Sequence, residues 1–385
     1  MSKSIPQLRN FPSWREEDIF PTISLKTAIS IEKELWIMLC SYSEVKKRGI
    51  ELVKSNSVSP SDANATWIRF KSYIGQAKNY WNTASLTSYE SSSLSYYYSF
   101  LNLVKAFLVL KDSNLPHDVY HGLSYKTTDS SSRLNDKMLT SHSGAKEAFS
   151  IYYEEVFSEK PPKSFKVVSL LGYPLDISYQ YMSGGFGSRK SFPFVYRIAI
   201  DPSRKKAWLV LALPSVAPIK YHKNSFPIFF DEFEQTLKPN TLGPGFRDMF
   251  NFKSQDWTQY DFYQSKINKE IDFVGDQILT GILVQKIKDS FGEWLSPNYY
   301  GDEHSGYINF PKNKAELSPM NEEIAIYELM FFMSDVVRYR PDYLDKILDS
   351  KAAWLLESFV ETCPLKFLRA ITSRIIGKTV VISSF

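Results

Sequence analysis

The chain has 385 residues, of which 43% are hydrophobic and 15% are aromatic. This composition excludes an intrinsically disordered protein, because disordered chains are poor in aromatic residues, and the length is sufficient for two or three packed regions. The 46 basic and 42 acidic residues leave a formal net charge of +4. A nucleic-acid site would therefore have to be a local patch on a balanced surface.

Cysteine content and hydropathy indicate the compartment. The two isolated cysteines, Cys40 and Cys363, are typical of a reducing environment, since secreted proteins of this length usually carry paired cysteines. The stretch from Met1 to Arg15 is polar and lacks the apolar segment of a signal peptide. No run of about 18 apolar residues occurs in the sequence. We therefore expect a cytoplasmic protein that does not associate with membranes.

The first part of the chain is expected to be helical. Residues 1–27 contain three prolines and predict an irregular lead-in, which a helical domain over residues 28–160 follows. Either Ser92 or Ser93 is suited to cap one of its helices. Apolar residues at helical spacing predict helices over residues 30–51, 65–84, 92–111 and 144–157.

Residues 164–235 differ in composition from the helical region before them, because runs of β-branched and aromatic residues alternate with turn residues. Turns are expected at residues 183–188 and 202–204. Strands are predicted over residues 166–171, 175–182, 192–201 and 206–213. Together these runs predict an inserted antiparallel meander of about four strands.

Helices return in a predicted C-terminal helical domain, residues 245–385, of which the first is expected over residues 273–295. Ser318-Pro319 is a typical helix start, since a cap residue precedes a proline at the first helical position, and this helix should end before Pro341. Further short helices are predicted to begin at Asp342, Lys351 and Pro364, and Gly377 is suited to end the last. The predicted fold class is α+β and predominantly α-helical.

Several short blocks are distinctive. Residues 70–73 read FKSY, residues 95–106 read SYYYSFLNLVKA and residues 121–124 read HGLS, and a later stretch, residues 325–344, contains Arg338-Tyr339-Arg340-Pro341. These blocks and their spacing resemble the YaaC family of bacterial proteins. The resemblance implies a fold and no particular chemistry.

The helix with Tyr96, Tyr97, Phe100 and Lys105 also resembles the second helix of HEPN-type helical bundles. Many such proteins cut RNA or act as partners of nucleotidyltransferases in stress or phage-defence systems. Their catalytic signature is an Arg and a later His with four to six residues between them. None of the five histidines in this sequence has an Arg at that spacing. The resemblance therefore implies an HEPN-like scaffold and favours a protein that is not an enzyme.

The densest polar and aromatic group consists of Ser95, Tyr97, Tyr98, Lys105 and His121. One interpretation is a pocket in which Lys105 and His121 meet an anion. The other is a bundle core in which the tyrosine hydroxyls are paired and the lysine reaches out to solvent. Aromatic residues at helical spacing favour the core.

A second group of candidates is basic. It comprises Arg338, Arg340, Lys366, Arg369, Arg374 and Lys378. Together they could form a patch that binds RNA or DNA phosphates. Cations also complement the dipole at a helix C-terminus, and solvated helix faces have the same composition. The balanced charge of the whole chain favours this second interpretation.

Other chemistries lack their residue patterns. His117 and His121 have helical ligand spacing, but the neighbouring Glu and the third ligand of a zinc site are missing, so no metal site and no cofactor is predicted. The Gly-rich residues 183–188 precede a predicted strand, which indicates a turn and argues against a phosphate loop. Cys40 and Cys363 are expected to be buried and inert.

These observations predict a non-catalytic interaction or regulatory subunit of a bacterial complex, for which the HEPN resemblance implies a stress or phage-defence system. The alternative is an RNA- or DNA-binding, or nucleic-acid-processing, protein that uses the basic C-terminal helix together with Lys105 and His121. A third possibility is small-molecule binding between the sheet and the bundle. We expect a protein partner and leave nucleic acid and homo-oligomerisation open.

Overall fold

The structure is a computed structural model of the whole chain, and it divides into two compact units. Residues 23–189 and 320–385 form the helical unit, and residues 1–22 and 190–319 form the sheet unit. The structure describes residues 9, 13–15, 22–25, 30–56, 62–125, 133–215, 233–236, 256–272, 295–297, 305–309, 320–348 and 350–382.

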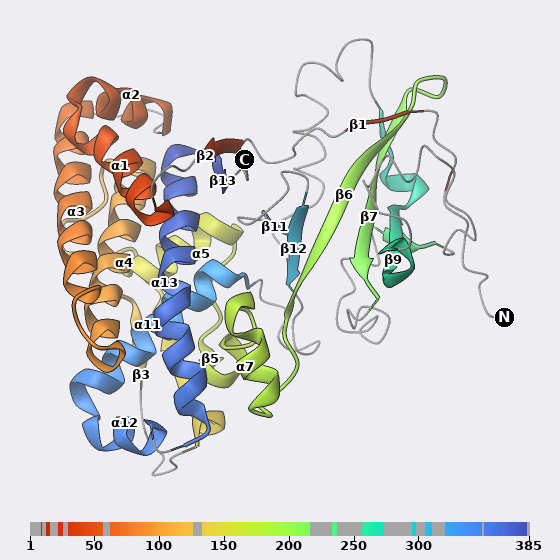
Figure 1. Cartoon of the computed structure of the whole chain (residues 1–385). Coiled ribbons are helices and arrows are strands. Elements are labelled where there is room, and N and C mark those ends of the chain that lie inside the picture. The colour runs from red at the N-terminus through yellow and green to blue at the C-terminus, as the bar shows by residue number, and fades with distance from the viewer. Residues whose placement is uncertain are drawn as a thin grey trace. The chain divides into compact units, whose positions relative to one another are not determined.

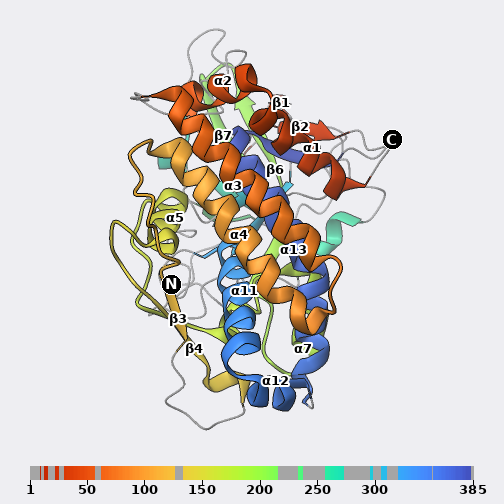
Figure 2. The same ribbon diagram turned by 90° about the vertical axis from the view of Figure 1, so that its left-hand side faces the viewer.

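Long helices from both ends of the sequence form the centre of the helical unit (Figure 1). They are α3 (Ala63–Ala84), α4 (Tyr89–Lys111), α11 (Glu322–Tyr339) and α13 (Ala352–Ile376). Figure 2 shows the orange pair α3 and α4 beside the blue pair α11 and α13. Helix α4 packs against the other three, and its apolar run from Phe100 to Leu110 is almost entirely buried. The predominantly helical character of the prediction is confirmed.

Shorter elements surround this centre. Helix α4 also packs against α5, and β3, β4 and β5 pair as an antiparallel sheet. Strand β13 pairs with β2. The bounds of these elements are α1 (Ile31–Glu44), α2 (Lys46–Asn56), α5 (Ala148–Phe157), α6 (Val167–Leu170), α7 (Ser178–Ser183), α12 (Pro341–Leu348), β2 (Thr22–Leu25), β3 (Leu123–Tyr125), β4 (Met138–Ser141), β5 (Ser164–Lys166) and β13 (Thr379–Ile382).

Side-chain caps define where the helices begin. The Asp62 carboxylate accepts hydrogen bonds from two backbone N–H groups in the first turn of α3, at 2.9 and 3.0 Å. Asn321 caps α11 in the same way through the N–H of Ile324, at 2.9 Å. Helix α13 ends at Gly377, which has a φ of 69°. That left-handed conformation suits glycine, and the predicted helix end at this residue is confirmed.

The sheet unit is built on one antiparallel sheet with the strand order β11-β12-β6-β7-β9-β8. Strand β12 pairs with the first half of β6, and β1 pairs with its second half. Strand β10 pairs with β7. Strands β6 and β7 are the longest and are buried along most of their length. The strands are β1 (Ser13–Arg15), β6 (Ser191–Asp201), β7 (Lys206–Pro214), β8 (Phe233–Gln235), β9 (Tyr260–Ser265), β10 (Ile271–Asp272), β11 (Leu295–Pro297) and β12 (Ser305–Asn309).

The β6–β7 hairpin confirms two predicted strands and the predicted turn between them. Its register pairs Val195 with Ala212 and Asp201 with Lys206. The Asp201 carboxylate accepts hydrogen bonds from the N–H groups of Ser203 (3.0 Å) and Arg204 (3.1 Å), which closes the turn.

Two other predicted strands are wrong. Residues 167–170 form α6, and residues 175–182 form a 3₁₀ turn followed by α7. In the second segment Ile177 and Tyr181 are buried, and this spacing of four residues is the helical period. The first segment is a short apolar run, whose period does not distinguish strand from helix. Residues 184–188 consequently connect α7 to β6 and do not join two strands.

The ends of the chain also differ from the prediction. The lead-in contributes strands β1 and β2, and the predicted C-terminal helical domain begins with strands of the sheet, β9 to β12. The predicted helix over residues 273–295 lies outside the described residues, apart from Leu295 in β11. The helix start predicted at Ser318-Pro319 lies outside them as well.

Helix α13 runs through Pro364, where a new helix was expected, because Phe359, Cys363 and Phe367 continue one buried face. Along the chain, the two units alternate at 22/23, 189/190 and 319/320.

Candidate interaction surface

The C-terminal end of α11 brings Arg338 against Tyr98 of α4. The Nη1 atom of Arg338 donates a 2.8 Å hydrogen bond to the Tyr98 hydroxyl, and its guanidinium lies 5.8 Å from the Tyr98 ring centre and 4.7 Å from that of Tyr339. Tyr80 of α3 stacks on Tyr98 at 5.2 Å. We call these four residues, Tyr80, Tyr98, Arg338 and Tyr339, the Arg338 surface.

Helix geometry places these side chains outside the core. Successive residues on a helix are about 100° apart, so neighbours fall on different faces. Trp81 and Tyr97 are 2% exposed, whereas their neighbours Tyr80 and Tyr98 lie at the surface or half-buried. Tyr339 is 61% exposed in the last turn of α11. The surface therefore combines a fixed guanidinium with solvent-accessible aromatic rings.

The predicted pocket residues Tyr97 and His121 both contact Phe331 of α11. The Phe331 ring centre is 5.3 Å from that of Tyr97 and 5.4 Å from that of His121. The Nδ1 atom of His121 accepts a 3.2 Å hydrogen bond from the Leu123 N–H, which places the imidazole proton on Nε2 in the neutral ring.

Electrostatics favour this neutral form of His121. Loss of hydration lowers the pKa of His121 below its ordinary value, and the Arg338 guanidinium lowers it further, although Glu147 opposes this effect. At neutral pH the ring is therefore an uncharged hydrogen-bond donor at the side of the Arg338 surface.

The other two predicted pocket residues are not drawn into this cluster. Lys105 follows Tyr98 by seven residues, which is about 10 Å along α4. It is half-buried, and desolvation lowers its pKa. Ser95 is half-buried one turn before Tyr98. Within the described residues, no hydrogen bond or ion pair joins Lys105 to His121, so the structure does not show the predicted anion pocket between them.

The six basic candidates do not form one exposed surface, which corrects the predicted patch. Lys366 is 2% exposed, and its Nζ lies 2.8 Å from a Glu322 oxygen and 3.0 Å from an Asp176 oxygen. Arg369 is 1% exposed and donates through Nε to the backbone oxygen of Val380, at 2.7 Å. Both side chains are therefore closed off from phosphate groups in solution.

Arg374 also has an internal partner. Its Nε lies 2.8 and 2.7 Å from the two carboxylate oxygens of Glu323, which also accepts a hydrogen bond from the Tyr152 hydroxyl. Only Arg338, Arg340 and Lys378 of the six predicted residues are exposed. No local sequence pattern indicates these pairings, because Glu322 and Glu323 stand in the first turn of α11, more than 40 residues before their partners.

Tyr80 and Tyr339, two members of the Arg338 surface, were not among the predicted site residues. Tyr80 stands one position outside the buried stripe of α3, and Tyr339 directly follows Arg338. The sequence signal for Tyr80 was an aromatic residue directly beside a buried helix stripe. The signal for Tyr339 was an aromatic residue next to a basic residue at a helix end.

Potential metal ligands, the two cysteines and the apolar helices bear on further expectations for the residues that the structure describes. Those residues contain no group of three or more His, Cys, Asp and Glu side chains that could hold a metal ion. Cys363 is buried as predicted, and desolvation raises the pKa of its thiol, while Cys40 is half-buried. In the same residues, no helix is both long enough and apolar enough to cross a membrane.

A family model described as YaaC-like Protein matches residues 49–375. Comparisons with curated proteins and with solved structures gave no significant match. The match covers the distinctive blocks around Tyr98, His121 and Arg338, which is also where the Arg338 surface lies. The HEPN-like character of the first helices stays a prediction. Because the match spans most of the sequence and enters both structural units, the chain belongs to the YaaC-like protein family.

Proposed function

We propose that this protein is a non-catalytic interaction subunit of a bacterial complex and that it binds a protein partner through the Arg338 surface. The observation that supports this proposal is the exposed aromatic group around a fixed guanidinium: Tyr80 is 39% and Tyr339 is 61% exposed. Tyrosine and arginine are enriched among the residues that contribute most to protein–protein binding.

The arrangement also lowers the entropic cost of binding. Arg338 is held by the Tyr98 hydroxyl and by two aromatic rings before any partner arrives. A side chain that is already ordered loses less freedom when an interface forms. Tyrosines add contact area with few rotatable bonds. The neighbouring Arg340 is exposed, so a partner with acidic groups around an apolar centre fits this surface.

The test compares surface variants of the full chain. Tyr339→Ala and Arg338→Glu should each weaken binding of the stoichiometric partner purified from the native host by about tenfold or more, since each removes a central contact. Lys346→Glu is the matched control, because Lys346 is an exposed cation on the adjacent helix α12. Equal partner binding by all three variants would contradict the proposal.

Binding of single-stranded RNA or DNA is the second candidate, and the same surface favours it. Bases stack on aromatic rings while arginines contact the backbone, and Tyr80, Tyr339, Arg338 and Arg340 offer both kinds of group. The burial of Lys366 and Arg369 removes the middle of the basic helix from this candidate.

Fluorescence anisotropy with an oligonucleotide of about 12 nucleotides separates the two candidates. Nucleic-acid binding predicts an affinity that falls steeply with salt and that Arg338→Glu reduces. An affinity that stays weak at low salt, together with a protein partner that depends on Arg338, supports the subunit. The cytoplasmic location and the stress or phage-defence context belong to this proposal and rest on analogy with related scaffolds.

A further inference from the structure

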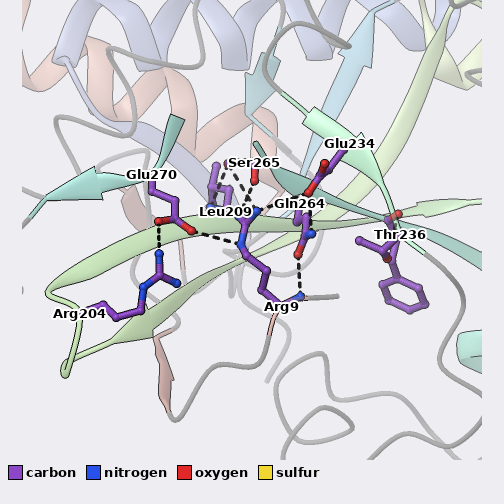
Figure 3. Close-up of polar contacts among 9 residues, drawn as sticks. Arg9, Arg204, Leu209, Glu234, Thr236, Gln264, Ser265 and Glu270 are labelled. Carbon is purple, nitrogen blue, oxygen red and sulfur yellow. Dashed lines mark hydrogen bonds and ion pairs between the residues drawn. The ribbon is translucent and has the colours of Figure 1, made fainter. Parts of the chain in front are cut away.

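Arg9 is enclosed within the sheet unit, where its guanidinium has two hydrogen-bond acceptors and a further ion-pair partner (Figure 3). Its Nε lies 3.2 Å from a Glu270 oxygen, its Nη1 lies 3.4 Å from a Glu234 oxygen, and its Nη2 donates to the backbone oxygen of Ser265. The guanidinium carbon also lies 5.1 Å from the ring centre of Trp208. The Arg9 side chain is 14% exposed.

The acceptors are positioned by bonds that do not involve Arg9. The Glu270 side chain is 1% exposed and pairs with Arg204 at 2.7 Å. Glu234 accepts a 2.8 Å hydrogen bond from the Gln264 amide. The Ser265 hydroxyl accepts a 3.2 Å hydrogen bond from the Leu209 N–H, which ties the end of β9 to β7. Contacts other than those to the guanidinium thus hold the acceptors in place, which lowers the cost of binding a guanidinium there.

The pattern of contacts suits a guanidinium. Its planar fork presents Nη1 and Nη2 in fixed directions, each donates to an acceptor of its own, and Nε lies in an ion pair with Glu270. The indole of Trp208 adds an attraction for the cation. A lysine ammonium is a point charge on a flexible stem and cannot reach all three partners at once. The site thus distinguishes arginine from lysine.

Arg9 comes to this pocket from a distant part of the sequence. The hydrogen bonds and ion pairs of its guanidinium reach residues more than 220 positions later. Its backbone N–H also donates to the Gln264 side chain, at 2.9 Å. The residues that contact its guanidinium lie on β7, β8 and β9 and directly before β10, so Arg9 stands in the position of a ligand carried on the same chain.

We propose that this pocket is a binding site for the arginine side chain of a partner protein segment and that Arg9 is its occupant in cis. A partner arginine must displace Arg9, whose attachment to the same chain gives it a high effective concentration. Binding in trans is therefore controlled by release of Arg9. This proposal concerns the sheet unit and does not depend on the Arg338 surface.

The test uses calorimetry on the full chain with a blocked arginine, N-acetyl-L-arginine methylamide, as the probe. Arg9→Ala should bind the probe at least about tenfold more tightly than the wild-type chain, because the competing side chain is gone. Adding Glu270→Gln to Arg9→Ala should weaken binding by about tenfold, since one charge-assisted contact is lost. Lys269→Ala, an exposed neighbour of the pocket, is the matched control and should leave binding unchanged.

Two comparisons make the outcome decisive. The blocked lysine analogue should bind Arg9→Ala at least tenfold more weakly than the blocked arginine, and equal binding would overturn the proposal. Free L-arginine should bind no better than the blocked form; a much tighter free form would identify a small metabolite and overturn the assignment to a protein segment. If Arg9→Ala does not fold, Arg9→Lys replaces it, and failure of that folded variant to gain arginine binding rejects the proposal.

Discussion

Glu328 on α11 is completely buried, and among the described residues neither of its carboxylate oxygens has a hydrogen-bond partner. Desolvation raises its pKa well above the usual carboxyl value. The carboxyl group therefore keeps its proton in the folded chain at pH values where it is ionised in the unfolded chain. A single residue thus couples folding to pH.

The sign of that coupling follows from the bound proton. Above the carboxyl pKa of the unfolded chain, the folded state binds one proton more, so the free energy of unfolding falls as pH rises toward the native pKa, by about 1.4 kcal/mol per pH unit. Glu328→Gln should flatten this dependence. Urea unfolding between about pH 5 and pH 8 measures it. Glu361→Gln, at an exposed position, should leave the slope as it is; the same slope in Glu328→Gln would contradict the assignment.

Gly49 and Gly75 of the helical unit differ in the space around them, so the same change to alanine should have opposite effects on stability. A Cβ at Gly49 would overlap the Trp67 indole and the Tyr42 carbonyl, whereas a Cβ at Gly75 meets no atom within 4 Å. Gly49→Ala should therefore destabilise the fold by about 1–3 kcal/mol through overpacking. Gly75→Ala should stabilise it by about 1 kcal/mol, because alanine is the better helix former. Thermal unfolding checks both, and two shifts of the same sign would contradict the packing of α2 against α3.

At the scale of elements, buried ion pairs join α13 to α11. Lys366→Met should lower the free energy of unfolding by about 3–5 kcal/mol, because it leaves Glu322 and Asp176 without their cation. Adding Glu322→Gln should recover part of that loss. Urea denaturation of the single and double variants measures the coupling. A Lys366→Met chain with unchanged stability and weaker RNA binding would show that Lys366 faces a ligand.

Helix periodicity explains which elements could be predicted. Helices α3 and α4 were expected within a few residues of their bounds, since Trp67, Phe70 and Ile74 repeat at helical spacing and are all buried. The sequence predicts strands where α6 and α7 lie, because segments of four to six residues are too short for their period to be determined. Pro364 was expected to begin a helix, but the buried face that continues through it outweighs the local preference of proline.

At the scale of the whole molecule, the helical unit depends on two segments that are far apart in sequence. Phe100 of α4 stacks on Phe367 of α13 at 4.1 Å, and Tyr97 packs on Phe331 of α11. A chain that ends at residue 319 would leave this face of α4 exposed. We expect it to lose cooperative unfolding and to bind a hydrophobic dye, as measured by circular dichroism and dye fluorescence. A truncated chain that unfolds as cooperatively as the full one would contradict this dependence.

The sequence by itself determined the fold class, the longest helices, the β6–β7 hairpin and the family, because helical and strand periods, turn chemistry and family blocks are local signals. Only the tertiary structure decided what the polar residues do. It buried Lys366 and Arg369 against acids and carbonyls from elsewhere, placed Tyr98 under Arg338, and brought Arg9 to Glu234 and Glu270 across more than 220 residues. Charge pairing and burial depend on distance in space, and no local pattern records which distant segments will meet.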